Sequence, residues 1–177
     1  MNRSAFFSWA FAAALSIGAA RSQAEDCVDF KWDVAQERAL FAGSATTLNA
    51  GADAKSAPVM QLKHLYELKL LPQEQVSFAV TPGKKSPRSD SHAGIAVFKI
   101  PGAGSYRVSI DMPFWIDVVH DGALVAANDF QGQHGCDSPH KIVMFDLQGG
   151  RPFILQLSNA APQSVRLTIT AAPARKL

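Results

Sequence analysis

Cysteine is scarce in this chain of 177 residues, which contains only Cys27 and Cys136. No Cys-x-x-Cys spacing occurs, which argues against a dithiol redox motif or a zinc ribbon. Long hydrophobic runs are also lacking beyond residue 24, where no stretch reaches the roughly 18 apolar residues of a transmembrane helix. We therefore expect a mature protein that does not cross a membrane by a helix.

A surplus of either charge is missing as well. The chain has 17 Lys and Arg residues against 15 Asp and Glu residues, and the first 24 residues contain two of the basic residues, Arg3 and Arg21, and none of the acidic ones. Without those 24 residues the charge is balanced. This balance excludes nucleic acid binding driven by gross electrostatics.

The first 24 residues have the pattern of a secretory signal peptide. A short basic start over residues 1–4 precedes an apolar run over residues 5–20, and Ser22 and Ala24 supply small residues at the −3 and −1 positions of a cleavage site. We expect cleavage near Ala24. The mature protein is then periplasmic or secreted.

The cysteine usage agrees with export. In an oxidising compartment a lone pair of cysteines is most simply one disulfide, here between Cys27 and Cys136. The chain-entropy model assigns a loop of this length roughly 4–5 kcal/mol. The competing interpretation is a metal-binding or redox pair.

The chain divides into three expected parts, which are a signal peptide (1–24), an N-terminal helix and linker (25–58) and a β-sandwich domain (59–177). Asp33 can cap a short helix over residues 34–42, which ends at Gly43. Residues 45–58 are rich in Ala, Thr, Gly, Asn and Ser. That composition predicts a linker.

Beyond Val59 the apolar residues follow a period of two, which is typical of half-buried strands. The turn Asp121-Gly122 is the strongest hairpin signal. The pattern predicts a mainly β protein, an antiparallel β-sandwich (jelly-roll-like) of about eight or nine strands with a short N-terminal helix. The strands are expected at 62–70, 76–80, 95–100, 106–110, 115–120, 123–127, 141–147, 153–158 and 165–170.

The stretch from Gly104 to Thr170 resembles the bacterial pre-peptidase C-terminal type of sandwich. The resemblance lies in Tyr106-Arg107-Val108 after a glycine-rich turn, a strand running into Asp121-Gly122, and Phe153-Ile154-Leu155 before a terminal strand. Sandwiches of this type usually act as secretion-associated or ligand-binding appendages. The resemblance therefore implies a binding or accessory role, here without a peptidase.

Four further segments resemble a family of small, uncharacterised exported proteins of Gram-negative bacteria. They are Cys27–Trp32, LYELKL at 65–70, WIDVV at 115–119 and GQHGC at 132–136. This second resemblance covers most of the mature chain and implies no established activity. Sequences of this type sometimes carry the name homogentisate 1,2-dioxygenase, a reaction that would need a cupin with a His-His-Glu triad. No glutamate follows Glu74 in this chain.

The segment Asn128–His140 (NDFQGQHGCDSPH) has no periodicity of its own and is expected to be a loop, the kind of segment that often carries function. His134 and His140 lie in it, and His120 precedes it. With a nearby carboxylate, these histidines could bind zinc or a non-haem iron. No HxH, HxxxH or HExxH spacing occurs, so the alternative is surface histidines on a loop pinned by the disulfide.

Aromatic residues suggest a ligand-binding face. Trp115 and Phe114 could stack on a sugar or a peptide if the outer face of their strand is open, and the alternative is that the N-terminal helix covers them. Asp129, His134 and Asp137 complete the set of candidate ligand-binding residues. No catalytic residue stands out.

Three functions are compatible with these observations. The first is a non-catalytic periplasmic binding or accessory module, without cofactor, for a protein, a peptide or an envelope glycan. The second is a metal-dependent enzyme, zinc or non-haem iron dioxygenase-like, that uses the segment Asn128–His140. The third is a structural accessory protein with no small ligand.

Overall fold

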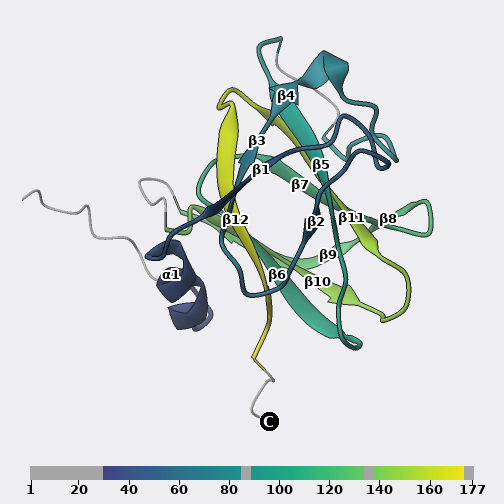
Figure 1. The fold of residues 1–177 in the computed structure, drawn as a ribbon. Coiled ribbons are helices and arrows are strands. Elements are labelled where there is room, and N and C mark those ends of the chain that lie inside the picture. Colours follow the sequence, from purple (N-terminus) through teal and green to yellow (C-terminus); the bar gives the residue numbers. More distant parts are fainter. Residues whose placement is uncertain (1–29, 85–88, 134–137, 174–177) are drawn as a thin grey trace, which may run out of the picture.

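The computed structural model describes residues 30–84, 89–133 and 138–173. Two β-sheets pack face to face around a shared apolar core, so the predicted mainly β sandwich is confirmed (Figure 1). All strand pairs are antiparallel except β1–β3 and β2–β5, which are parallel.

Sheet A has the order β1-β3-β12-β6-β10-β9, and sheet B has the order β2-β5-β11-β7-β8 with β4 beside β5. The strands of sheet A are β1 (Thr46–Asn49), β3 (Tyr66–Lys69), β12 (Ser164–Ala171), β6 (Gly104–Ile110), β10 (Lys141–Leu147) and β9 (Ala127–Gly132). Those of sheet B are β2 (Val59–Met60), β5 (His92–Phe98), β11 (Phe153–Ala160), β7 (Trp115–His120), β8 (Ala123–Val125) and β4 (Leu71–Pro72). The helices are α1 (Ala35–Phe41) and the 3-10 turn η1 (Gln73–Gln75). Neither helix of the described chain is long and apolar enough to span a membrane.

Alternation along the strands explains the core, because every second side chain of a strand points to the same face. The three C-terminal strands bury the sets that the sequence predicts, and all of these side chains are at most 5% exposed. They are Val143, Phe145, Leu147, Phe153, Leu155, Leu157, Val165, Leu167 and Ile169.

The segment 45–58 is not a linker, since it contains β1, which pairs with β3. Ala50 and Gly51 behind β1 are buried, and Gly51 exchanges backbone hydrogen bonds with Ile95. A Cβ at Gly51 would lie 2.6 Å from the backbone of Ala57. The small residues that suggested a linker are therefore required by close packing.

Two expected strands and one expected loop differ clearly from the observed elements. The strand expected at 62–70 covers only β3, and residues 76–80 form no strand but place Val76 and Phe78 on the outer face of sheet B. The segment Asn128–His140 is not a loop throughout, because β9 continues to Gly132. The hairpin at Asp121-Gly122 is confirmed, with φ values of 48° and 75° that suit this turn.

The N-terminal part covers the outer face of sheet A. In Figure 1, α1 lies beside β12. Asp33 accepts a hydrogen bond from the backbone N–H of Ala35 at 2.9 Å, but the N-cap residue is Val34, whose backbone oxygen accepts the first intrahelical bond and whose side chain makes no capping bond. The cap expected at Asp33 is therefore wrong, because the helix begins one residue later than the sequence predicts. The interpretation in which this helix covers Trp115 is wrong, because Trp115 belongs to sheet B.

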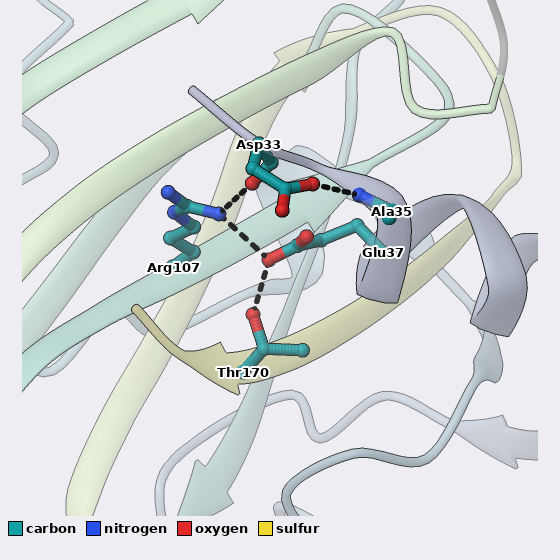
Figure 2. Close-up of polar contacts among 5 residues, drawn as sticks. All are labelled: Asp33, Ala35, Glu37, Arg107 and Thr170. Atoms are coloured by element: carbon teal, nitrogen blue, oxygen red, sulfur yellow. Dashed lines mark hydrogen bonds and ion pairs between the residues drawn. The ribbon is translucent and has the colours of Figure 1, made fainter. Parts of the chain in front are cut away.

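Polar side chains fix α1 to the sheet (Figure 2). The Glu37 carboxylate accepts hydrogen bonds from the Thr170 hydroxyl at 2.6 Å and from the Arg107 guanidinium at 3.4 Å. Arg107 also donates to the backbone oxygen of Asp33 at 2.7 Å. One buried carboxylate thus joins α1 to both β6 and β12.

Candidate functional site

Of the two aromatic residues expected to bind a ligand, only Trp115 is accessible. Phe114 is completely buried in the core between the sheets, so its expected contact with a ligand is wrong. It precedes β7, where strand alternation does not yet apply. Trp115 is partly exposed at the first position of β7.

Asp129 makes a structural contact with the N-terminal segment. Its carboxylate pairs with the ammonium group of Lys31 at 2.5 Å, and this hydrogen bond lowers the pKa of Asp129. Gln131 accepts a hydrogen bond from the backbone N–H of Lys31. Asp129 therefore holds the N-terminal segment on β9, away from Trp115.

The expected metal ligands are not brought together where the structure describes them. His120 ends β7 and stacks on Phe153 at a ring-centroid distance of 4.3 Å. His140 adjoins Lys141, whose ammonium group donates to the Phe114 backbone oxygen at the start of β7. With a rise of roughly 3.3 Å per residue, the two ends of β7 are roughly 16 Å apart.

Within residues 30–84, 89–133 and 138–173, no three His, Cys, Asp or Glu side chains form a group that could hold a metal ion. Four of the expected site residues lie outside these ranges. They are Cys27, His134, Cys136 and Asp137.

A cavity of about 220 Å³ opens between the two sheets at their β7 and β9 side, and we call it the edge cleft. Within the described chain, β8 pairs only with Val118–His120, and the chain then crosses at Ala126 into β9 of the other sheet. The start of β7 therefore faces β9 with no described strand between them. The edge cleft is lined by Trp115, Ile116, Ala127, Phe130, Lys141 and Val143.

Phe130 is strongly exposed on the rim of the cleft. Its side chain is 67% exposed although it lies opposite buried Val143 in the ladder and so points toward the inner face. Sheet B does not extend far enough to cover it. Sequence reasoning missed Phe130, and the available signal was a large aromatic residue inside an otherwise polar segment.

The Trp115 ring is held in a fixed position. Its indole N–H donates to the Asp117 carboxylate at 3.0 Å, and the backbone N–H of Gly83 donates to the other Asp117 oxygen at 3.0 Å. The ammonium groups of Lys141 and Lys84 lie 5.4 Å and 5.8 Å from the ring centroid. Both are within cation–π distance of the same indole.

Burial changes the acid–base properties of this cluster. It raises the pKa of Asp117, although the hydrogen bonds from Gly83 and Trp115 oppose the shift. It lowers the pKa of Lys141, with the Asp117 charge opposing and the Lys84 charge reinforcing the shift. Two cations and one carboxylate thus share a partly desolvated position beside the cleft.

A larger cavity of about 580 Å³ lies on the outer side of sheet A, near Trp32 and Arg107. Its charged side chains are engaged within the protein. Arg107 bonds to the helix segment, and the Ser105 hydroxyl donates to Asp146. The edge cleft is the better candidate because an exposed aromatic side chain and an apolar lining meet there.

The edge cleft has the properties of a binding site. Its lining is mostly apolar, and its indole and ammonium groups are fixed by contacts with Asp117 beside the cleft and with the backbone of Phe114. Comparison with protein-family models gives no match, and no curated protein matches the chain, so its function is argued from this geometry.

Proposed function

We propose that this protein is an exported, non-catalytic binding module whose edge cleft takes an extended peptide segment of a partner protein. The observation that carries this proposal is the opening between the start of β7 and the edge strand β9, with Phe130 exposed on its rim.

Strand addition explains why a peptide suits this place. An extended peptide can hydrogen-bond to the backbone of an edge strand, and every second side chain then points to the same side. A side chain on the cleft side would meet Ile116, Val143 and the exposed ring of Phe130. Apolar residues of the partner would therefore gain burial there.

The composition of the cleft favours a peptide over a glycan. Sugars are held through several hydrogen bonds, but of the six lining side chains only Trp115 and Lys141 carry hydrogen-bonding groups. The indole N–H of Trp115 already donates to Asp117, and Lys141 already donates to the backbone of Phe114. An apolar side chain of a peptide needs no hydrogen bonds from the lining.

Export is part of the proposal and rests on the sequence. We infer that residues 1–24 are a signal peptide cleaved near Ala24, which makes the protein periplasmic or secreted. In that compartment Cys27 and Cys136 would form one disulfide. The resemblance to secretion-associated sandwiches of the pre-peptidase C-terminal type supports the same role.

Selection from a phage-displayed peptide library tests the binding function. The full chain, expressed with its own N-terminus, should enrich peptides that carry alternating apolar residues. Phe130→Ala should abolish their binding. Val59→Ala is the matched control, because Val59 is 68% exposed on β2 at another sheet edge.

Two other outcomes would contradict the proposal. Binding to a glycan array that depends on Trp115, without any enriched peptide, would assign the cleft to an envelope glycan. Stoichiometric zinc or iron in protein purified from the periplasm would instead favour a metal-dependent enzyme.

A further inference from the structure

A second cavity of about 320 Å³ lies on the outer face of sheet B, and we call it the outer pocket. The segment that follows η1 forms one wall, and the end of β11 forms the floor. The outer pocket is lined by Gln73, Phe78, Thr81, Pro82, Lys84, Ser158 and Asn159.

The floor of the outer pocket contains an unused hydroxyl group. Ser158 is 1% exposed, and its Oγ has no hydrogen-bond partner in the described part of the chain. A buried hydroxyl without a partner costs free energy, so such groups usually mark a bound ligand, a water or a strained site. In a cavity large enough for a small group, this hydroxyl points to a ligand.

The outer pocket adjoins the edge cleft through Trp115. Ser158 and Trp115 are directly opposed on β11 and β7, and cross-strand neighbours of this kind lie about 5 Å apart. Trp115 lines the edge cleft, and Ser158 lines the outer pocket. Lys84, which also lines the outer pocket, lies 5.8 Å from the centre of the Trp115 ring, so the two cavities are neighbours at this indole.

Lys84 gives the outer pocket a positive charge. It lines the pocket, and no carboxylate of the described residues forms an ion pair with it. The nearby Asp117 carboxylate is already engaged by Gly83 and Trp115. Lys84 and Lys141 approach the same indole, so an added negative charge would relieve their repulsion.

We propose that the outer pocket binds a carboxylate of the same peptide whose apolar side chain occupies the edge cleft. The Lys84 ammonium group provides the charge, and the Ser158 hydroxyl donates a hydrogen bond to the carboxylate. This inference rests on the proposed function. The carboxylate comes from the peptide C-terminus or from an acidic side chain, which share the same chemistry.

Three peptide probes test the inference by NMR titration of the full chain. They are acetyl-Ala-Leu-Ala-Phe with a free C-terminal carboxylate, the same peptide as its C-terminal amide, and the amide extended by one glutamate. The free acid should bind about tenfold more tightly than the amide, as expected for a charge-assisted hydrogen bond. If the glutamate probe binds more tightly than the free acid, the carboxylate that the outer pocket binds comes from an acidic side chain and not from the C-terminus.

Variants separate the outer pocket from the edge cleft. Lys84→Met should remove the preference for the free acid over the amide. Ser158→Ala should reduce the preference without loss of stability, because its hydroxyl has no partner to lose. Lys99→Met, at an exposed lysine beyond β5, is the matched control and should change nothing.

The outcomes distinguish the two proposals. Equal affinities for acid and amide, or a preference that survives Lys84→Met, would overturn the carboxylate pocket and leave the peptide cleft standing. Binding of none of the probes at millimolar concentration, together with an empty peptide selection, would overturn both.

Discussion

Glu37 and Arg107 form an ion pair that is almost completely removed from solvent, with side chains that are 1% and 5% exposed. Such a pair has lost its hydration, so it depends on the hydrogen bonds around it. The Thr170 hydroxyl and the Asp33 backbone oxygen supply two of these. The attachment of α1 to sheet A therefore depends on mutual charge compensation.

Removal of one partner should be costly. Arg107→Ala leaves the Glu37 carboxylate buried without its cation, and we expect the free energy of unfolding to fall by about 3–5 kcal/mol. The double variant Glu37→Leu/Arg107→Met should lose much less than the sum of the single losses. Urea denaturation measures all three values, and additive losses would show that the two side chains act independently.

Close packing makes Gly94 a sensitive position. A Cβ there would lie 2.3 Å from the Cβ of Ala50 and 2.8 Å from the Leu70 side chain. Gly94→Ala should lower the free energy of unfolding by about 1–3 kcal/mol through overpacking. Gly102→Ala is the control, since no atom lies within 4 Å of a Cβ at that position. Equal thermal stability of the two variants would contradict this account.

The buried carboxyl of Asp117 should make stability depend on pH. Its pKa is raised above 3.8 by burial, so the folded state holds the proton more tightly than the unfolded state. The stability contributed by the protonated form is present below pH 3.8 and is lost as the pH rises through the folded-state pKa.

Asp117→Asn provides the comparison, because the amide does not titrate. The unfolding free energy of the wild type relative to this variant should fall as the pH rises through that window. The lowered pKa values of Asp53, Glu67 and Asp129 affect both proteins alike and cancel in the difference. A difference that is constant with pH would rule out the burial effect.

The disulfide prediction concerns residues outside the described ranges. If Cys27 pairs with Cys136, replacement of either by Ser should lower stability by roughly 2–5 kcal/mol, and the double variant should be no worse than either single variant. Thiol titration of unfolded, unreduced protein from the periplasm measures the pairing. Two free thiols would refute it.

Much of the sandwich was predictable because strand alternation is a local property. The bounds of β10 match the expected strand at both ends, and the inner side chains of β11 and β12 follow from period two. The hairpin turn at Asp121-Gly122 was predictable for the same reason, since its chemistry lies in two adjacent residues.

The predictions that were wrong concern features that depend on contacts between segments far apart in the sequence. Ala50 and Gly51 suggested a linker because nothing local shows that Ile95 and Ala57 approach them. Phe130 was missed because its exposure results from where sheet B ends. The prediction of the site therefore failed where it depended on which strands lie next to each other in the folded protein.

The single-residue crossing at Ala126 has a consequence for how binding specificity can change. Continuing the register of β8 beyond Val125 would pair residues 126–128 with Trp115–Asp117 and close the opening. The position of the crossing therefore sets how far the opening extends along β7. A shift of this crossing would, under the proposed function, change which partner segments fit the opening, and it would also change the pairing of Ala127 with Phe145 in sheet A.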